Sequence, residues 1–569
     1  MTILHGIGII LIIAITIAVG IPIGHYLYQL FGQETSKTDR FFLPMEKLLY
    51  RLIGVNPSVK MDWKAYLRAL LIVNLVMMVF VYLVLRLQGF LPLNPSHKPG
   101  LSWDLAFNTA TSFITNTNWQ SYSGEQTLSY FSQMVGITFL QFTSAATGFV
   151  AAIAFLRALV AHKKEWIGNF WVDIIKIHTR VLLPVSVVFA VVFIALGVPQ
   201  TLQGTAVVHT LSGHLQAISR GPIASLEVIK QFGTNGGGYM NANSAHPFED
   251  PSAWTTVLEM VLMGSVSAGL VWTFGLMIKN RKQAIVLYVF LTAILLLGAF
   301  VIYASESAGN PLLTHLFGLQ GPNMEGKEVR FGTSLSSVFA AMTTAFTTGA
   351  VNAMHDSFMP LGGMVPLVFM MFNLVFGGKG VGLLNILMFL IITVFLSGLM
   401  VGRTPEVFGK KIEAKEIKLA TMAMLVHPFL ILIPTALFLS TKSGIAMLGN
   451  PGLHGLSEML YAFTSGAANN GSAFAGLSAN NVFFNVTQGI VMILGRYVSL
   501  IAMFAIAGSL AKKAVTPNSV GTLKTDTFAF GGVFVAVFVI VGALTFFPAL
   551  AIGPIGEHFS MWSALNGHP

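Results

Sequence analysis

Ten long apolar stretches constrain the fold of this chain more than any other feature. A helix needs roughly 20 apolar residues to cross a bilayer, and each stretch is long enough. Only 9% of the 569 residues are charged, against about 25% in soluble proteins. The sequence therefore predicts an all-α, multi-pass membrane protein with ten transmembrane helices. The stretches are 5–30, 66–88, 128–160, 170–197, 253–278, 283–304, 360–402, 418–440, 482–511 and 527–550.

The basic residues indicate the orientation of these spans. Of the 32 Lys and Arg residues, 23 fall in five polar connections. Clustered Lys and Arg are typical of cytoplasmic loops, so this distribution argues against a nucleic-acid partner. The four remaining inter-span regions and both chain termini are then expected on the outer side. The five connections are 32–68, 157–180, 279–282, 403–418 and 512–524.

Four short segments line up without gaps, each led by a phenylalanine. Two places after each Phe stands a hydroxyl, and the other residues are mostly small or carry amides. One such segment is typical of a surface turn, but four in register between spans favour a ring of backbone carbonyls around an ion. The segments are Phe113-Ile-Thr-Asn-Thr-Asn118, Phe232-Gly-Thr-Asn-Gly-Gly237, Phe346-Thr-Thr-Gly-Ala-Val351 and Phe463-Thr-Ser-Gly-Ala-Ala468.

A short apolar run precedes each segment, at 103–114, 222–233, 334–346 and 456–463. Runs of this length cannot cross a bilayer, and re-entrant helices of this kind occur only inside protein or around water. The predicted unit is a span, a pore helix, a loop and a second span, repeated four times around a central pore. The predicted parts are an extra N-terminal helix (1–31), unit 1 (66–160), unit 2 (165–279), unit 3 (283–402), unit 4 (417–512) and a C-terminal helix (527–550).

The seventh span is unusual because glycines interrupt it. Four glycines stand between positions 377 and 382, and glycine disfavours a continuous helix. We predict a break at 376–383, with Lys379 at membrane depth. A lysine there is costly and usually faces water or a partner. It is either an electrostatic plug below the ion site, or it pairs with an acid or extends to the cytoplasm.

The loop chemistry favours a monovalent cation. Glycine allows left-handed turns, and backbone carbonyls can replace the water shell of an ion. Rings of Asp or Glu are more typical of divalent-cation filters, and none of the four segments contains an acid. We expect a hydroxyl ring from Thr115, Thr234, Thr348 and Ser465. Nearby acids either attract cations to the mouth or are ordinary solvated or capping residues. These acids are Glu125, Glu249, Asp250, Asp356 and Glu458.

The loop residues resemble those of the KdpA family, the channel-like subunits of bacterial Kdp potassium pumps. The resemblance is carried by Thr115-Asn-Thr-Asn-Trp-Gln120, by Gly233 to Tyr239 with His246 to Pro251, and by Thr464 to Gly471. It implies four fused channel-like units in the bacterial cytoplasmic membrane, selecting K+ from outside. It also implies partners: a KdpB-like P-type ATPase, a KdpC-like subunit and a small KdpF-like membrane peptide.

The resemblance also implies roles for individual residues. Gln120 supports selectivity, the glycine-rich break is a gating loop, and Arg403 and Arg496 contact the ion pathway or another subunit. An internal ion pair of Arg496 with Glu259 or another buried acid is the alternative. The implied filter residues are Thr115, Asn116, Thr117, Asn118, Thr234, Asn235, Gly236, Gly237, Thr347, Thr348, Gly349, Ala350, Val351, Thr464, Ser465, Gly466, Ala467 and Ala468. The gating loop is Gly377, Gly378, Lys379, Gly380 and Gly382.

Polar residues in the third span leave two readings open. Gln141, Thr143, Ser144 and Thr147 either line a water-filled tunnel or bond back to their own helix.

The sequence holds no phosphate-binding loop of the G-x-x-x-x-G-K-[ST] type. We therefore expect no catalytic centre and no bound nucleotide in this chain, with ATP hydrolysed by a partner. A stand-alone potassium channel or cation symporter of the same superfamily is the alternative. An intramembrane enzyme is disfavoured, because no catalytic dyad stands in the spans.

Overall fold

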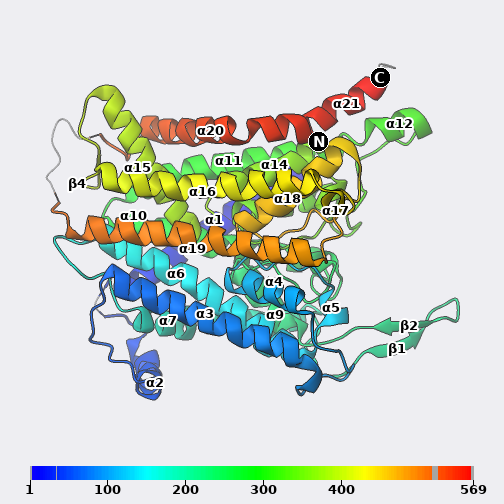
Figure 1. The fold of residues 1–569 in the computed structure, drawn as a ribbon, viewed down its shortest axis with the longest axis horizontal. Coiled ribbons are helices and arrows are strands. Elements are labelled where there is room, and N and C mark those ends of the chain that lie inside the picture. The colour runs from blue at the N-terminus through cyan, green and yellow to red at the C-terminus, as the bar shows by residue number, and fades with distance from the viewer. Residues whose placement is uncertain (1–2, 34, 516–522, 566–569) are drawn as a thin grey trace.

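The computed structural model describes residues 3–33, 35–515 and 523–565, and the fold is almost entirely helical (Figure 1). Within these residues, ten helical segments are long and apolar enough to cross a membrane, which confirms the predicted fold class. Part of the fifth basic connection, at 516–522, lies outside the described residues. The segments are built from α1 (Ile3–Phe31), α3 (Trp63–Leu87), η1 (Gln88–Phe90), η2 (Ser132–Thr138), α6 (Phe139–Val160), α7 (Phe170–Ile177), η3 (His178–Leu182), α8 (Leu183–Ala195), α10 (Ala253–Met277), α11 (Arg281–Ser307), α12 (Pro311–Phe317), α15 (Val381–Val401), α16 (Ala414–Leu439), α19 (Val482–Lys512), α20 (Phe528–Leu550), η6 (Ala551–Ile555) and α21 (Gly556–Leu565).

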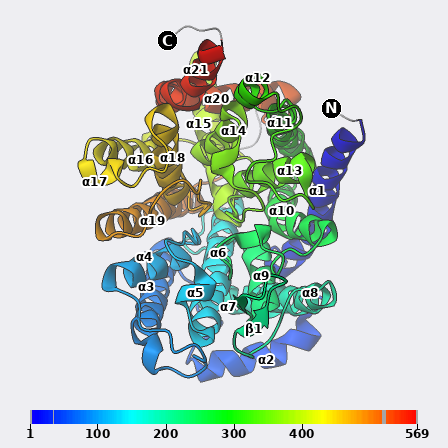
Figure 2. The ribbon, with the colours of Figure 1, turned by 90° about the vertical axis from the view of Figure 1, so that its right-hand side faces the viewer.

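Four shorter helices stand around the centre of the molecule when it is viewed from one end (Figure 2). They are α4 (Trp103–Ile114), α9 (Ile223–Phe232), α13 (Gly332–Ala345) and α18 (Gly452–Ala467). Nearly all their residues are buried. The predicted pore helices are therefore present, but α18 extends four residues beyond the predicted run at each end.

The seventh span breaks earlier than the glycines predict. Helix α14 (Pro360–Phe372) ends before Asn373, which adopts a left-handed φ of 47°, and α15 begins at Val381. The side chain of Asn373 accepts from Thr347 Oγ1 at 2.9 Å and donates to the Ala468 carbonyl at 3.1 Å. The break begins at Asn373 because its amide is engaged by two neighbouring segments, a long-range effect that local glycine content does not encode.

Small residues let α1 lie against α10. A Cβ added at Gly20 would stand 2.6 Å from Ala268 Cβ, and one at Gly24 would stand 2.6 Å from the Gly269 carbonyl oxygen. Backbone approach of this kind is how helices associate where no water drives them together. The N-terminal helix is thus fixed to the second span of unit 2.

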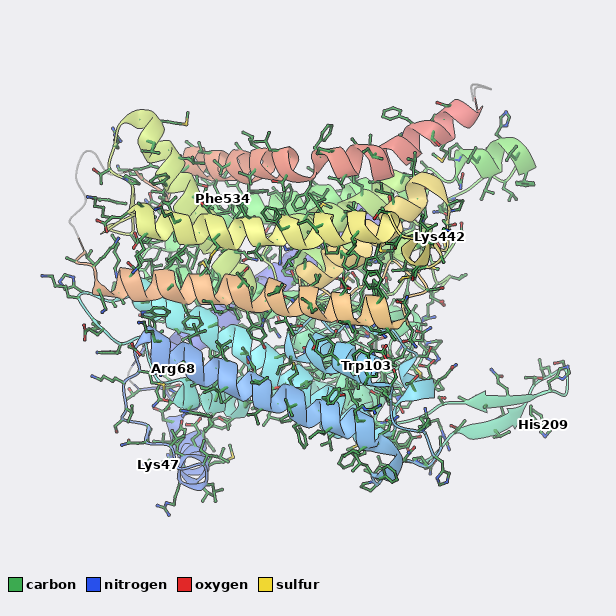
Figure 3. The ribbon with its side chains drawn as sticks, viewed as in Figure 1. Lys47, Arg68, Trp103, His209, Lys442 and Phe534 are labelled. Carbon is green, nitrogen blue, oxygen red and sulfur yellow. The ribbon has the colours of Figure 1, made fainter. Side chains whose placement is uncertain are left out.

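The two ends of the molecule carry different elements (Figure 1). Lys47 and Arg68 lie at one end, whereas Trp103, His209 and Lys442 lie at the other (Figure 3). The second end also carries the pore helices and both described chain ends (Figure 1). The remaining elements are α2 (Asp39–Leu52), α5 (Gly124–Thr127), α17 (Lys442–Ile445), η4 (Asn243–Ala245), η5 (His355–Ser357) and two antiparallel hairpins, β1 (Ala206–His209) with β2 (Leu215–Ile218) and β3 (Glu406–Val407) with β4 (Lys410–Lys411).

Candidate functional site: a ring of four pore loops

The four loops that follow the pore helices share one backbone conformation. In each loop, two residues with a positive φ stand two positions apart, just after the helix ends. Positive φ is uncommon outside glycine, so its fourfold recurrence at one spacing defines a common register. The pairs are Asn116 and Asn118, Thr234 and Gly236, Thr347 and Gly349, and Asn469 and Gly471.

Backbone hydrogen bonds repeat in the same register. In each loop, the amide between the two left-handed residues donates to the carbonyl five residues earlier, in the last turns of the pore helix. The bonds are Thr117 to Ser112 (2.9 Å), Asn235 to Lys230 (2.9 Å), Thr348 to Thr343 (2.8 Å) and Asn470 to Ser465 (2.9 Å). We call residues 115–118, 233–236, 346–349 and 468–471 the pore-loop ring.

This register corrects the prediction for the fourth segment. Residues Thr464 to Ala467 form the last turn of α18 and are not an extended loop. The Thr464 carbonyl accepts from the Ala468 amide at 2.9 Å, and the Gly466 carbonyl from the Asn469 amide at 3.1 Å. Their carbonyls are therefore used within the helix end. Ala468 begins the loop, and Asn469 to Gly471 take the positions that the prediction gave to the preceding residues.

The same register shows that the leading phenylalanines are not equivalent positions and that the expected hydroxyl ring does not form. Phe113 lies five residues before Asn118, whereas Phe463 lies eight residues before Gly471, so the two are not equivalent. Thr115 Oγ1 donates to the Thr111 carbonyl at 2.8 Å, and Ser465 Oγ accepts from the Gly471 amide at 2.9 Å. The four hydroxyls therefore occupy different positions and form no common layer. The better sequence signal was Asn469-Asn-Gly471, because Asn and Gly adopt left-handed turns most readily.

The loops contact one another closely enough to close the ring. A Cβ added at Gly236 would lie 2.1 Å from the Thr348 carbonyl oxygen, at Gly349 1.9 Å from that of Asn470, and at Gly471 1.7 Å from that of Thr117. Each glycine is therefore required both by its positive φ and by the carbonyl of the next loop. The contacts run from loop 2 to loop 3, to loop 4 and to loop 1.

Loop 1 joins loop 2 through side chains instead. Asn116 Nδ2 donates to the Thr234 carbonyl at 2.7 Å, and Asn118 Nδ2 donates to Asn235 Oδ1 at 3.3 Å. Gln120 bonds Gly238 twice, from Nε2 to the carbonyl (3.1 Å) and from the Gly238 amide to Oε1 (3.0 Å). Asn116 and Asn118, the second of which stands where the other loops have glycine, thus supply the fourth junction of the ring.

The third span supports the ring from behind. Gln141 Nε2 donates to the Gly237 carbonyl at 2.8 Å, and Ser144 Oγ donates to Asn116 Oδ1 at 2.9 Å. Thr143 and Thr147 instead bond carbonyls of their own helix, at 3.2 and 2.9 Å. Bonding back to their own helix thus holds for Thr143 and Thr147, whereas Gln141 and Ser144 bond the loops, and the water-filled tunnel stays a prediction. Of the predicted residues next to loop 3, Ala350 is buried and the Val351 amide bonds Asn243 Oδ1 at 3.3 Å.

A wide cavity lies above the ring and a narrower one below it. The outer cavity has a volume of about 820 Å³ and is lined by residues of all four loops, among them Asn118, Gly236, Gly349 and Gly471. The inner cavity has a volume of about 60 Å³ between α14, α15, α16, α19 and α20, and Asn373 and Asn469 line it. The ring thus stands between two spaces of different size.

The broken helix packs directly beneath loop 2. The Lys379 amide donates to Thr234 Oγ1 at 3.1 Å, and the Gly377 amide donates to the Ala345 carbonyl at 3.0 Å. Lys379 is 2% exposed, and its Nζ lies 3.8 Å from the centroid of the Phe232 ring. Within the described chain this ammonium has no hydrogen-bond partner. The structure therefore supports neither the acid partner nor the extension of Lys379 to the cytoplasmic end.

The two predicted arginines have different surroundings. Arg496 is buried near Lys379, since a Cβ at Gly148 would lie 3.0 Å from an Arg496 guanidinium nitrogen and 2.4 Å from the Lys379 carbonyl oxygen. Its guanidinium donates to the Ser144 carbonyl at 3.4 Å, whereas Glu259 accepts from Gln231. The alternative ion pair with Glu259 is thus not formed. Arg403 is exposed.

The acids expected at the mouth divide into three groups. Glu249 and Asp250 are fully buried, so the first of the two alternatives, that they attract cations at the mouth, does not hold for them. Their partners are buried as well: Lys230 Nζ lies 2.6 Å from Glu249, and Thr256 bonds Asp250 at 2.5 Å. Glu125 is partly exposed and accepts from the Asn241 amide at 2.9 Å.

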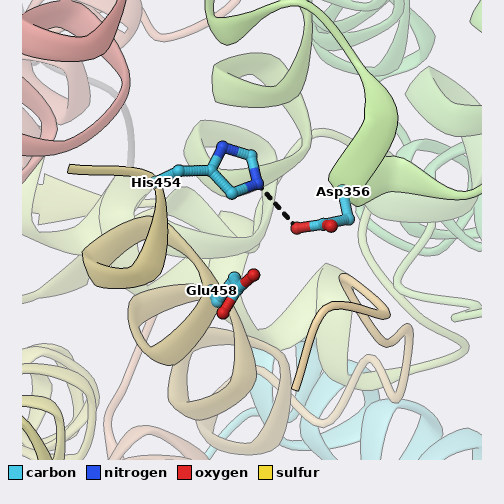
Figure 4. Close-up of side chains that lie close together, drawn as sticks. All are labelled: Asp356, His454 and Glu458. Carbon is cyan, nitrogen blue, oxygen red and sulfur yellow. Dashed lines mark hydrogen bonds and ion pairs between the residues drawn. The ribbon is translucent and has the colours of Figure 1, made fainter. Parts of the chain in front are cut away.

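Asp356 and Glu458 gather around His454 (Figure 4). His454 Nε2 lies 2.7 Å from Asp356, and its Nδ1 lies 2.8 Å from Glu557. Burial alone would lower the pKa of His454, but hydrogen bonds to both carboxylates outweigh it and raise that pKa to about 10. The ligand atoms of Asp356, His454 and Glu458 are close enough for a metal, yet a protonated imidazole has no free lone pair to offer.

In the described part of the chain, ten segments long and apolar enough to cross a membrane and a closed ring of four pore loops define a multi-pass membrane protein of the fused pore-loop class. Residues 10–559 match the family model described as "Potassium-transporting ATPase A subunit", KdpA. The chain belongs to this family.

Three relatives carry the name "Potassium-transporting ATPase potassium-binding subunit". That of Alicyclobacillus acidocaldarius is 65% identical, over 99% of this chain and 100% of its own length. That of Caldanaerobacter subterraneus is 52% identical (96% and 98%), and that of Geobacillus kaustophilus 51% identical (97% and 98%). A solved structure of the potassium transporter TrkH from Vibrio parahaemolyticus aligns with a TM-score of 0.49 at 14% identity, covering 88% of this chain and 97% of that one.

Proposed function

We propose that this chain is the potassium-binding subunit of an ATP-driven potassium uptake pump, and that K+ binds in the pore-loop ring. The observation that carries the proposal is the closure of the ring, in which Gly236, Gly349 and Gly471 each meet a carbonyl of the next loop. Neutral carbonyl oxygens from four closely packed loops can replace the water shell of a monovalent cation. The shared name of the relatives supports K+ as that cation.

The revised register changes which residues hold the ion. We assign the site to the backbone of residues 115–118, 233–236, 346–349 and 468–471, with Gln120 as a brace between loops 1 and 2. Thr464 to Ala467 position the fourth loop from the end of α18. The filter is asymmetric, because loop 1 uses asparagine where the other three use glycine.

Work against a gradient must come from a partner. A tenfold gradient costs about 1.4 kcal/mol per ion, and this chain has no nucleotide-binding motif. We propose a KdpB-like ATPase as the source, with KdpC-like and KdpF-like subunits in the complex, as the family resemblance implies. The inner cavity of about 60 Å³ is a suitable first part of the route to that partner.

The positions of the basic residues support an orientation of the chain in the membrane and a barrier to K+ below the ring. The basic connections are assigned to the cytoplasm, which places the ring and the chain termini on the outer side of the bacterial inner membrane. Lys379 and Arg496, two buried cations below the ring, oppose straight passage of K+ into the cytoplasm. Arg403 remains a proposed contact to another subunit.

The test combines binding with transport. K+ binding to the purified chain is measured by calorimetry, and ATP-dependent K+ uptake is measured in vesicles with and without the partner subunits. Gly471→Ala is expected to abolish both, whereas Gly532→Ala, where an added Cβ meets nothing within 4 Å, retains both. Full transport by this chain alone, without ATP, would instead favour the stand-alone channel or symporter.

A further inference from the structure

A buried cluster of charged residues lies behind loop 2. It comprises Glu227 and Lys230 of α9, Glu249 of the following loop, and Glu259 of α10, all fully buried. Lys230 Nζ lies 3.0 Å from Glu227 and 2.6 Å from Glu249. Two carboxyl groups thus share one ammonium, and the third, Glu259, accepts from Gln231 Nε2 at 2.8 Å. Because unpaired buried charge is costly, the cluster must retain protons that exposed carboxylates would release.

Two sets of hydrogen bonds connect the cluster to the ring. The Lys230 carbonyl accepts from the amides of Asn235 (2.9 Å) and Gly236 (3.1 Å). Lys230 Nζ also donates to Ser244 Oγ at 2.8 Å. The Ser244 amide bonds Asn243 Oδ1 at 2.9 Å, and Asn243 Nδ2 donates to the Gly236 carbonyl at 2.8 Å. Lys230 therefore connects the acids to the loop twice, once through its backbone carbonyl and once through its side chain.

The other three units use a neutral group at the position of Lys230. Ser112 donates to the Trp119 carbonyl at 2.9 Å, Thr343 accepts from the Gly349 amide at 3.0 Å, and Ser465 accepts from the Gly471 amide at 2.9 Å. In those units the loop is fixed by a hydroxyl that does not titrate. Unit 2 alone places a titratable network at this position.

We propose that the cluster of Glu227, Lys230, Glu249 and Glu259 is a proton-exchanging support of loop 2, so that K+ binding in the ring and proton release from the cluster are coupled. The inference rests on the proposed function, because it takes K+ as the ligand of the ring. A cation in the ring stabilises the ionised carboxyl behind it, and reciprocity requires that ionisation strengthen cation binding equally.

The electrostatic surroundings place this exchange near neutral pH. Burial raises the pKa of Glu227 to about 8, with a further contribution from Glu249 and an opposing one from Lys230. Burial acts against the charged form of Lys230 as well, but Glu227 and Glu249 outweigh it and raise its pKa. The amine therefore stays charged while Glu227 titrates.

Other charged groups approach the cluster from the outer loops. Burial raises the pKa of Asp250 to about 6. Arg330 bonds the Asp250 and Ala245 carbonyls and pairs with Glu328, and His246 and Glu125 lie nearby. Helix α8 and segment η2, which also pack on α9, carry no ionisable side chain, and α6 carries only Arg157, which is paired with Asp173.

The experiment measures K+ affinity and proton release together. The full-length chain, with any subunits that remain bound, is titrated with K+ by calorimetry at about pH 6.5 and about pH 9, on either side of the pKa of Glu227. Proton release is followed with a dye in weak buffer near pH 8. The expected result is an affinity about fivefold to twentyfold higher at the alkaline pH, with protons released on K+ addition.

Variants separate exchange from mere support of the fold. Glu227→Gln is expected to remove most of the proton release and to flatten the pH profile of K+ affinity. The matched control is Glu306→Gln, which alters a buried acid paired with Lys327 in unit 3 at 2.8 Å and should leave both intact. Equal K+ affinity at the two pH values without proton release in the wild type would overturn the coupling. So would full proton release in Glu227→Gln. Absence of K+ binding at either pH would overturn the proposed function and the coupling with it.

Discussion

The pore-loop ring is repeated in all four units, whereas the layer directly below it is not. In the ring, one backbone conformation recurs in all four loops, including the spacing of left-handed residues and the bond back to the pore helix. Below the ring the recurrence ends: only the seventh span is broken, among the described spans, and Lys379 and Arg496 come from units 3 and 4 alone. The repeated ring is suited to binding an ion, and the unrepeated layer below it is suited to controlling the path of that ion.

The largest expected effect comes from disturbing the ring. In Gly349→Ala the new Cβ meets the Asn470 carbonyl oxygen at 1.9 Å, at a φ of +92°. A left-handed conformation costs a residue with a side chain about 1–2 kcal/mol before any clash, so K+ affinity should fall at least about tenfold. Calorimetric titration checks this, with Gly532→Ala as the control. Unchanged affinity would show that the ring tolerates a side chain and is not closed as described.

A change below the ring should leave binding intact and alter passage. Lys379→Met removes the unpaired ammonium over the Phe232 ring but keeps the length of the side chain. Passive K+ flux into vesicles should rise about tenfold, which corresponds to about 1.4 kcal/mol of lost repulsion, with K+ affinity nearly unchanged. Lys47→Met, at an exposed position, is the control. A fall in affinity without a rise in flux would assign Lys379 to the ring instead.

Asn373 connects the two layers, and its removal should affect stability more than selectivity. Asn373→Ala deletes the hydrogen bonds to Thr347 and Ala468, which should destabilise the fold by about 1–3 kcal/mol. Thermal unfolding of the purified protein measures the change, and Asn241→Ala, at an exposed position, provides the comparison. A normal melting temperature together with altered K+ selectivity would place Asn373 in the ion site itself.

The smallest expected effect lies at the outer rim, far from both layers. The pKa of His454 is raised to about 10 by Asp356 and Glu557. A raised folded pKa contributes stability that is fully present below the unfolded value of about 6.5 and is lost as pH rises through about 10. The melting temperature should therefore fall by about 1–3 °C more in wild type than in His454→Gln between about pH 8 and about pH 10.5. Parallel pH profiles in the two proteins would contradict the ion pair.

The sequence predicted the spans and pore helices well, because apolar length is a local property. It misplaced the fourth loop, because Thr464 to Ala468 resemble the other segments in side chains while the turn itself is made by Asn469 and Gly471. It also could not show that Glu249 is buried, since the partner Lys230 lies on another element. The residue types were thus recognised correctly. Their positions were not, because these depend on backbone torsion angles and on long-range pairing, which the sequence pattern does not show.

The contact of Gly471 with the Thr117 carbonyl has a consequence for biosynthesis. It joins the first repeat to the last, so the ring stays open until nearly the whole polypeptide has been made and inserted. Contacts between such distant parts form late, and unfinished membrane domains are prone to misassembly. An ion that binds only the closed ring would stabilise finished molecules and leave truncated ones unaided. The ligand would then act as a check on complete synthesis.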